Sequence, residues 1–358
     1  MPIVAHSPLP TFDALRAAGE PVLTRPEAEH QDIRELHIGL LNMMPDAALR
    51  VTEQQFMRLI GMANPIVQVY VHVFTVPGGP RDAETRAYID RYYTSFDELR
   101  AKGLDALVVT GANPQTARLE DEEFYEPLAE VMEWAGEHVT STLCSCLSTH
   151  AILQHTYGVH RRPLLAKRWG VYPHRNCEVD HPLLRGINTR YDVPVSRWNA
   201  ISSAQIKAVG LRVLAETEDG DLHVGTSPDG IRTVFMQGHP EYDTVSLLKE
   251  YKREVDRHLR GEIPAPPLPE GYLPPAAARI AADHLERALV ADDPSAVPFP
   301  EAELVRYLDN TWTDTAKAVY NNWLGLVYRL TGFERGRPFM PHVDPDDPLG
   351  LRARTAGA

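Results

Sequence analysis

The pattern of hydrophobic and polar positions predicts alternating strands and helices. Apolar runs with the length of buried strands are separated by stretches with helical periodicity. The predicted strands are residues 37–42, 67–74 and 106–110, and the predicted helices are residues 47–60, 88–99 and 122–135. The first helix is expected to turn Gln54, Gln55 and Arg58 toward solvent. This alternation predicts an α/β fold with a mostly parallel sheet and helices on both faces.

Further along, an apolar, β-branched segment leads to Cys146, and residues 211–237 have the pattern of paired strands with turns at residues 218–221 and 228–230. The dipeptide Thr110-Gly111, Cys146 and His239 each follow a predicted strand. In open parallel sheets, ligands bind beyond the carboxyl ends of the strands. We therefore expect one crevice to hold all three positions.

A proline-rich connector at residues 262–275 is the clearest break in the chain. We divide the sequence into an N-terminal extension (1–32), an α/β domain (33–261), this connector and a helical C-terminal extension (276–358) that ends in a disordered tail. The extension carries an aromatic and aliphatic stripe. Its members are Trp312, Tyr320, Trp323, Val327 and Leu330. The stripe is expected to pack on the main domain or on a partner subunit.

The composition of the chain argues against several classes of function. The chain has 358 residues, of which 43% are hydrophobic, and a formal net charge of -13, which argues against nucleic-acid binding. No apolar run approaches the ~18 residues of a membrane span, and the N-terminus lacks an export signal, so we expect a cytoplasmic protein without a membrane partner. Cys144, Cys146 and Cys177 cannot form a disulfide framework. The sequence also has three histidines at five-residue spacing, His150, His155 and His160. This spacing does not place them on one face of a helix, so no metal site is expected.

Candidate chemistry lies at residues 141–150 and 237–242, which together supply a thiol, an imidazole and a carboxylate. Cys146 stands between a predicted strand and a predicted helix, the layout of a nucleophile elbow. The unpaired N–H groups and the dipole at a helix N-terminus favour thiolate over thiol. The backbone N–H of Leu147 is the first candidate for an oxyanion donor. These features predict covalent catalysis.

An ordered set of motifs resembles the MetA family of homoserine O-acyltransferases. The motifs are residues 40–45 (LLNMMP), 109–112 (VTGA), 141–146 (STLCSC), 170–172 (GVY), 196–197 (SR) and 238–243 (GHPEYD). The match covers about residues 33–261, with a weaker echo at residues 311–312 and 322–324. The resemblance implies a fold related to class I glutamine amidotransferases. It also implies transfer of an acyl group from acyl-CoA, a co-substrate and not a resident cofactor, to the hydroxyl of L-homoserine in methionine biosynthesis. Members of this family are usually homodimers.

The resemblance also implies roles for single residues. Cys146 matches the nucleophile that carries the acyl thioester, His239 the proton acceptor, and Glu241 its partner. The positions that match substrate contacts are Lys167, Ser196 and Arg253. A guanidinium on the helix after Glu241 suits the substrate α-carboxylate. Two departures from the family pattern, Leu147 in place of Trp and His150 in place of Gln, change the shape of the expected crevice and remove no catalytic group.

Gln115 aligns with the position where the family's choice of acyl donor is associated with Gly for succinyl-CoA and Glu for acetyl-CoA. A glutamate would repel the free carboxylate of a succinyl group, whereas a neutral amide can donate a hydrogen bond to it. We therefore predict succinyl transfer, with acetyl transfer as the alternative.

Two other classes stay open at this stage. A thiol, imidazole and carboxylate in this order also serve a glutamine amidotransferase-like hydrolase, although Ser145 and Ser148 replace the Gly-x-Cys-x-Gly context of those enzymes. A non-catalytic binding protein on the same fold is the other class, and the presence of all three groups argues against it.

Overall fold

A computed structural model describes residues 2–30, 33–63 and 66–352, whose strands form one 11-stranded sheet in the order β2-β1-β4-β3-β5-β6-β11-β10-β9-β7-β8. The strands are β1 (Ile3–Ala5), β2 (Val22–Thr24), β3 (Leu36–Leu41), β4 (Val69–Phe74), β5 (Ala106–Val109), β6 (Ser141–Ser145), β7 (Arg162–Asn176), β8 (Arg190–Ala200), β9 (Arg212–Thr217), β10 (Leu222–Thr226) and β11 (Thr233–Met236). From β2 to β11 neighbouring strands are parallel, and the pairs from β11 to β8 are antiparallel.

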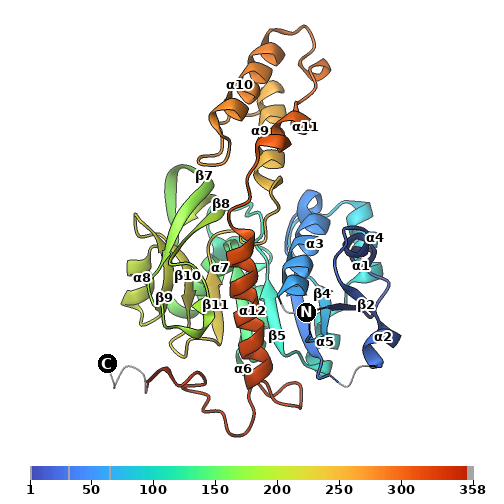
Figure 1. Cartoon of the computed structure of the whole chain (residues 1–358), viewed down its shortest axis with the longest axis vertical. Coiled ribbons are helices and arrows are strands. Elements are labelled where there is room, and N and C mark those ends of the chain that lie inside the picture. Colours follow the sequence, from blue (N-terminus) through green and yellow to red (C-terminus); the bar gives the residue numbers. More distant parts are fainter. Residues whose placement is uncertain (1, 31–32, 64–65, 353–358) are drawn as a thin grey trace.

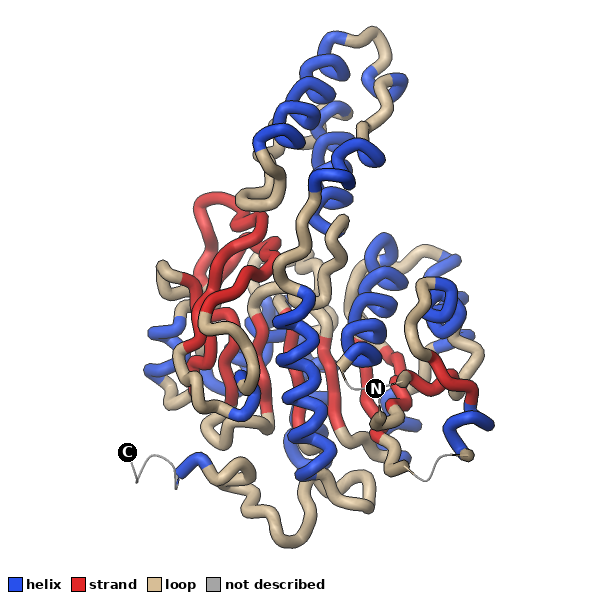
Figure 2. The backbone as a smooth tube through the Cα atoms, in the orientation of Figure 1, coloured by secondary structure: helices blue, strands red, loops and turns tan. Residues whose placement is uncertain are grey.

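Helices cover both faces of this sheet, which confirms the predicted α/β fold (Figures 1 and 2). The helices are α1 (Pro10–Ala17), α2 (Arg25–Glu29), α3 (Asp46–Met62), α4 (Ala83–Tyr92), α5 (Phe96–Lys102), α6 (Tyr125–His138), α7 (Leu147–Tyr157), α8 (Ser203–Ala208), α9 (Ser246–Leu259), α10 (Pro275–Val290), α11 (Glu301–Leu304) and α12 (Thr313–Leu330). One core contains residues of α1, α3 and α12, and the other contains residues of α5, α6 and α7.

The central strands are apolar along their whole length because both of their faces are covered. Along β5, Val108 faces the core under α3 and α12, while Leu107 and Val109 face the core under α6 and α7. All three side chains are fully buried. Successive side chains of a strand point to opposite faces of the sheet, so one continuous apolar run contributes to both cores, as the sequence pattern predicted.

Local capping divides the region that the sequence presented as one helical stretch, residues 88–99. Asp82 accepts a hydrogen bond from the backbone N–H of Thr85 at the start of α4, and Ser95 does the same for Glu98 at the start of α5. Each cap satisfies an N–H that has no partner inside its helix. Two helices therefore stand where one was predicted.

Several elements lay outside the sequence-based predictions. Within the segment 1–32, β1 and β2 add two parallel strands to one edge of the sheet. The long ribbon of β7 and β8 forms the other edge. Strands β1 and β2 are therefore hydrogen-bonded parts of the main sheet. The term N-terminal extension describes only where this segment stands in the sequence.

The predicted aromatic stripe is buried: Trp312 directly precedes α12, and the other four residues lie on that helix. Tyr320, Trp323 and Val327 are fully buried in the core that α12 shares with α3. The indole N–H of Trp323 donates to the hydroxyl of Ser141, 2.7 Å away, on β6. The stripe thus packs on the body of the same chain. The proposed disordered tail falls in part on residues 353–358, which lie outside the described residues.

Helices α9, α10 and α11 form a lobe that projects beyond the body (Figure 1). Its small core joins Leu248 and Tyr251 of α9 to Ala281 of α10. The proline-rich connector returns to β7, where the backbone N–H of Val171 donates to the carbonyl of Glu270 at 2.8 Å. Gly170 has a φ of 149°, and a Cβ there would overlap the backbone of Glu270, so only glycine permits this close approach.

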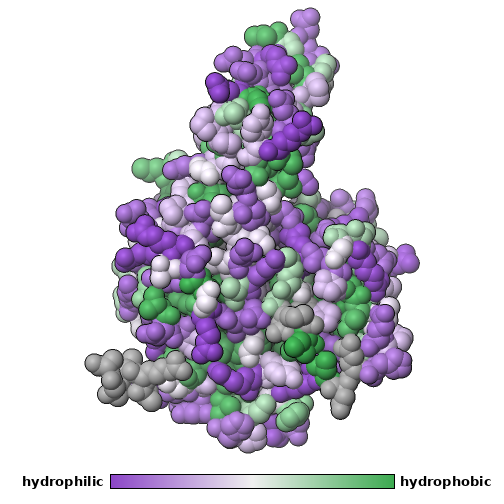
Figure 3. Space-filling model, in the orientation of Figure 1, coloured by the Kyte–Doolittle hydropathy of each residue, from purple (hydrophilic) through white to green (hydrophobic). Residues whose placement is uncertain are grey.

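On the face drawn in Figure 3, hydrophilic residues cover most of the lobe and mix with hydrophobic residues over the body. Among the described residues, no helix is both long enough and apolar enough to cross a membrane.

Candidate active site

Cys146 occupies a sharp turn between β6 and α7. Its φ of 55° and ψ of -113° make it the one non-glycine residue with positive φ in the described part of the chain. Such a conformation costs about 1–3 kcal/mol and requires support from its surroundings. The backbone N–H of Cys146 donates to the carbonyl of Met236 at 2.8 Å, and the Thr149 hydroxyl donates to the same carbonyl at 3.0 Å. The geometry is that of a nucleophile elbow.

His239 lies beside this thiol, at the end of the neighbouring strand β11. Its Nδ1 is 2.8 Å from Oε1 of Glu241, and its ring also shares a hydrogen bond with Cys146. Burial disfavours the charged imidazole, but Cys146 and Glu241 outweigh that effect and raise the pKa of His239 well above its usual value. The three residues therefore form a thiol, imidazole and carboxylate chain in the predicted order.

The end of β5 faces the elbow at Gly111. A Cβ at Gly111 would lie 3.5 Å from the Cβ of Cys146 and 3.7 Å from the backbone nitrogen of Leu147. Leu147 is the first residue of α7, where an N–H has no acceptor within its helix. The amide of Leu147 and the side-chain-free approach at Gly111 are therefore suited to an oxyanion next to the sulfur.

A second polar cluster surrounds Glu250, which the sequence analysis did not select. Its carboxylate accepts hydrogen bonds from the hydroxyls of Ser196 and Tyr242, at 2.7 and 2.6 Å, and lies 3.4 Å from Nζ of Lys167. Burial raises the pKa of Glu250, but Lys167 and the two hydroxyls lower it below its usual value overall. The Tyr242 ring stacks on His239 with centroids 4.3 Å apart, so this cluster adjoins Cys146, His239 and Glu241.

The three predicted substrate-binding residues are unequally placed. Lys167 on β7 and Ser196 on β8 both contact Glu250, and the ammonium of Lys167 also lies 4.0 Å from the centre of the Trp169 ring. Arg253 is on α9, one turn beyond Glu250, and 57% of its side chain is exposed. Its Nε is 4.0 Å from a carboxylate oxygen of Glu254. The guanidinium of Arg253 is thus at the rim, where it is accessible to solvent.

Gln115 lies in the loop after β5 and is exposed. Its backbone N–H donates to Oε1 of Glu122 at 2.8 Å, and the backbone N–H of Thr116 donates to the same oxygen at 2.6 Å. The side-chain amide of Gln115 donates to the carbonyl of Asn113 at 3.0 Å. Glu122 therefore anchors the loop, and the Gln115 amide is turned to its own backbone.

Helix α3 contacts residues 243–246, which follow His239 and Glu241, and one detail of the prediction for this helix was wrong. Gln55, expected to face solvent, is buried and donates to Asp243 at 3.2 Å and to the hydroxyl of Ser246 at 2.9 Å. The start of α9 covers it, a tertiary contact that helical periodicity cannot reveal.

The two departures from the family pattern have defined surroundings. His150 Nε2 is 2.9 Å from Oε1 of Gln237, and burial lowers the pKa of His150 to about 3 despite that hydrogen bond. Gln237 also accepts from the backbone N–H of Ile201 at 2.6 Å and precedes the catalytic loop. His150 therefore donates from Nε2 to the Gln237 side chain as a neutral imidazole, and Leu147, the first residue of α7, is buried.

The sequence held a signal for Glu250 that was not used. Glu250 stands three residues before Arg253, and this helical spacing brings it to the same side of the helix as Arg253, a predicted substrate residue. A carboxylate on a polar helix is ordinarily solvated, and only the neighbours from β7 and β8 distinguish Glu250 from that case.

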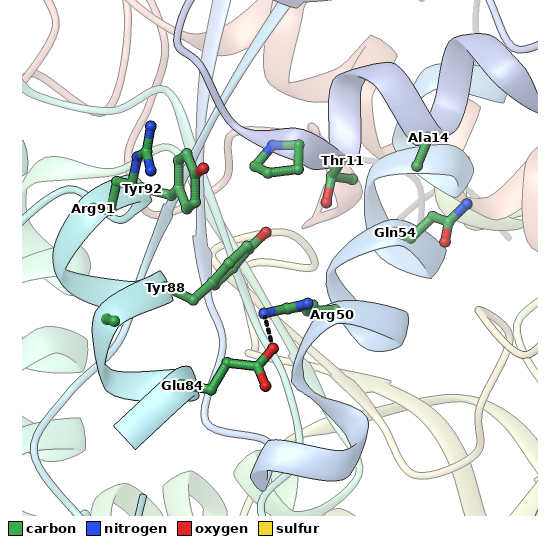
Figure 4. Close-up of a pocket in the computed structure, with 10 residues that line it drawn as sticks. Thr11, Ala14, Arg50, Gln54, Glu84, Tyr88, Arg91 and Tyr92 are labelled. Atoms are coloured by element: carbon green, nitrogen blue, oxygen red, sulfur yellow. Dashed lines mark hydrogen bonds and ion pairs between the residues drawn. The ribbon is translucent and has the colours of Figure 1, made fainter. Parts of the chain in front are cut away.

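Two searches bear on other kinds of site. In the described part of the chain, no cluster of three or more His, Cys, Asp or Glu side chains has the arrangement of a metal site. A surface pocket of about 440 Å³ lies between α1, α3 and α4 (Figure 4). Arg50, Glu84 and Tyr88 line it, and it includes none of the proposed catalytic residues.

Known proteins similar to this chain point to one activity. A family profile described as "HTS: Homoserine O-succinyltransferase" matches residues 2–333. A homoserine O-succinyltransferase of Thiobacillus denitrificans is 55% identical, covering 98% of this chain and 100% of that protein. One of Nitrosococcus oceani is also 55% identical, covering 99% of this chain and 100% of that protein.

Among solved structures, a glutamine amidotransferase of Thermotoga maritima has a TM-score of 0.42 at 13% identity, covering 83% of this chain and 99% of that chain. A glutamine amido transferase of Methylobacillus flagellatus has a TM-score of 0.43 at 13% identity, covering 82% and 95%. The assignment does not depend on these distant likenesses. The full-length identity and the family profile show that the chain belongs to the homoserine O-succinyltransferase family.

Proposed function

We propose that this protein transfers the succinyl group of succinyl-CoA to the hydroxyl of L-homoserine through a thioester on Cys146, in methionine biosynthesis. The observation that carries the proposal is the hydrogen-bonded chain of Cys146, His239 and Glu241 at a strained elbow. It stands in a chain whose full-length relatives are named homoserine O-succinyltransferases, which favours the succinyl donor over the acetyl alternative.

In the first half-reaction, the Cys146 thiolate attacks the thioester carbonyl of succinyl-CoA. The new S–C bond forms, the bond from the acyl carbon to the CoA sulfur breaks, and the CoA thiolate takes a proton from the His239 imidazolium. A raised pKa of His239 keeps that proton available beside the thiolate. The N–H of Leu147 donates to the oxyanion, a contribution of about 3 kcal/mol for one such donor.

In the second half-reaction, the homoserine hydroxyl attacks the Cys146 thioester and gives its proton to His239. The O–C bond forms, the bond to Cys146 breaks, and the thiolate returns beside a charged imidazole. Glu241, hydrogen-bonded to Nδ1 of His239, keeps Nε2 free for the proton and stabilises the cation. A general base of this kind contributes about 10²–10⁴-fold.

Recognition of homoserine follows from the charges around Glu250. The substrate carries an ammonium and a carboxylate on one carbon, and the site offers the Glu250 carboxylate beside the Lys167 ammonium, both of them partly buried. We assign the substrate ammonium to Glu250 and the hydroxyl of Ser196, and the substrate carboxylate to Lys167 and, from the rim, Arg253. Tyr242 joins this cluster to His239 by stacking on its ring.

The test is acylation without acceptor. Incubation with succinyl-CoA alone should leave one succinyl adduct on Cys146, located by peptide mapping. An adduct on Cys144 or Cys177 instead, or no adduct together with turnover that requires both substrates bound at once, would overturn the covalent route. Release of ammonia from glutamine at a comparable rate would favour the hydrolase class.

We further propose that the enzyme works in the cytoplasm, as a homodimer. Light scattering at micromolar concentration tests the subunit number directly.

A further inference from the structure

Trp312, directly before α12, contacts the segment that follows His239 and Glu241. The first turn of α12 lies beneath the lobe, and the rest of the helix runs along the body (Figure 1). Trp312 is only 2% exposed, and its indole N–H donates to the backbone carbonyl of Tyr242 at 2.8 Å. A buried indole N–H requires an acceptor, so this hydrogen bond fixes the two groups relative to each other.

A second contact joins the start of α12 to the same segment. Nδ2 of Asn310 donates to the hydroxyl oxygen of Thr244 at 3.1 Å. Oδ1 of Asn310 accepts a hydrogen bond from the backbone N–H of Trp312 at 3.3 Å. Asn310 therefore holds both the backbone of Trp312 and the segment that the indole of Trp312 contacts.

Tyr242 connects this anchor to both halves of the candidate site. Its ring stacks on the His239 imidazole with centroids 4.3 Å apart, and its hydroxyl donates to Glu250 at 2.6 Å. Its backbone N–H donates to the carbonyl of His239 at 3.2 Å, while its own carbonyl accepts from Trp312. The position of the Tyr242 ring on His239 therefore depends on the hydrogen bond from Trp312.

Helix α12 is a firm support for this contact. Tyr320, Trp323 and Val327 are fully buried in the core that α12 shares with α3. The indole N–H of Trp323 donates to the hydroxyl of Ser141 at the start of β6. A functional group held from a packed helix is placed more precisely than one held from a loop.

We propose that Trp312 is a positioning residue that holds the Tyr242 ring on His239 and the Tyr242 hydroxyl on Glu250. It thereby aligns the general base with the site for the substrate ammonium. The inference rests on the proposed covalent route and on the proposed assignment of that ammonium to Glu250. It gives the C-terminal extension a role in catalysis. Precise placement matters because a shift of about 1 Å in a reacting group can cost about 10²-fold in rate.

The experiment replaces Trp312 with Phe in the full-length enzyme, which keeps an aromatic ring and removes the N–H donor. Well below the unfolding temperature, the single-turnover rate of Cys146 acylation should fall about 3- to 10-fold. KM for L-homoserine should rise by a similar factor, whereas KM for succinyl-CoA should stay within about twofold of wild type.

Trp323→Phe is the matched control, because it makes the same change on the same helix and removes the hydrogen bond to Ser141. It should lower the unfolding temperature and leave the acylation rate and both KM values unchanged. If Trp312→Phe also lowered only the unfolding temperature, its role would be structural and the proposal would be wrong.

A double-mutant cycle tests whether Trp312 acts through the Tyr242 ring. Tyr242→Leu removes the stacked ring, so adding Trp312→Phe to it should change the acylation rate by less than about twofold. Losses that add in the double variant would overturn the assignment.

If Trp312→Phe does not fold, Asn310→Ala decides, because Asn310 is exposed and binds the same segment. It should show smaller changes of the same kind, and a wild-type acylation rate with a wild-type KM for L-homoserine would refute the proposal. The adduct measurement separates this inference from the proposed function. A wild-type enzyme that forms no succinyl adduct on Cys146 contradicts the covalent route, whereas a normal adduct with unchanged kinetics in Trp312→Phe contradicts only the positioning role.

Discussion

Replacing Glu250 with Gln removes a partly buried negative charge while keeping the size of the side chain. In the free enzyme, two hydroxyl hydrogen bonds, at 2.7 and 2.6 Å, lose their charged acceptor, and the Lys167 ammonium at 3.4 Å loses its counter-ion. In the complex, the substrate ammonium loses its anionic partner. A hydrogen bond to a charged group contributes about 1.5–3 kcal/mol, against about 1 kcal/mol for a neutral one.

The difference for the substrate ammonium is therefore about 1–2 kcal/mol, and the unpaired Lys167 adds to it. At about 1.4 kcal/mol per tenfold change, kcat/KM for L-homoserine should fall about 10- to 100-fold. Acylation of Cys146 by succinyl-CoA does not involve the amino acid. Its rate in the absence of acceptor should therefore stay within about threefold of wild type, since no donor contact of the acyl group is removed.

The assay has two parts. Steady-state rates at varied L-homoserine give kcat/KM, and release of the free CoA thiol in a single turnover without homoserine gives the acylation rate. Asp256→Asn is the control, because Asp256 lies on the same helix and its side chain is exposed to solvent. If Glu250→Gln slowed acylation as much as it lowered kcat/KM, Glu250 would support the catalytic chain and would not be the amine site.

His239→Ala should lose about 10²–10⁴-fold in kcat, and Glu241→Gln should lose less because the imidazole keeps a hydrogen-bonded partner; a loss below tenfold in His239→Ala would contradict the general base. Gln115→Glu should lower kcat/KM for succinyl-CoA more than for acetyl-CoA, because the new carboxylate repels the succinyl carboxylate. Two charges ~4 Å apart repel by about 4 kcal/mol at a dielectric of ~20, before solvent screening of this exposed position. Equal effects on both donors would show that Gln115 does not face the acyl group. Burial and the charges of two neighbouring histidines lower the pKa of His72 to about 2. Below pH 6.5, the unfolded chain therefore binds a proton at this residue that the folded chain does not bind, and the free energy of unfolding falls as pH falls. Between pH 7.5 and 5, urea unfolding of His72→Gln should therefore lose about 2 kcal/mol less than wild type, and the same loss in both proteins would refute this reasoning.

The sequence alone determined the layers of the fold and the chemistry of the nucleophile. Strands buried on both faces must be apolar throughout, so the run at residues 106–110 marked β5 and, with its neighbours, a covered parallel sheet. The elbow was predictable because a reactive residue between a strand and a helix leaves few other geometries, and Cys146 indeed has a φ of 55°. The order of motifs was specific enough to indicate the family.

Only the tertiary structure decided which polar residues meet. Helical periodicity treats Gln55 and Glu250 as surface positions. Gln55 is buried because the start of α9 covers it, and Glu250 is only 14% exposed because side chains of β7 and β8 contact it. Ion pairs between distant segments are likewise invisible in the sequence: Arg162, the first residue of β7, has neighbours of no special pattern, yet it pairs with Asp221 at 2.7 Å. Side-chain contacts between distant segments depend on sheet order and register, which local propensity does not encode.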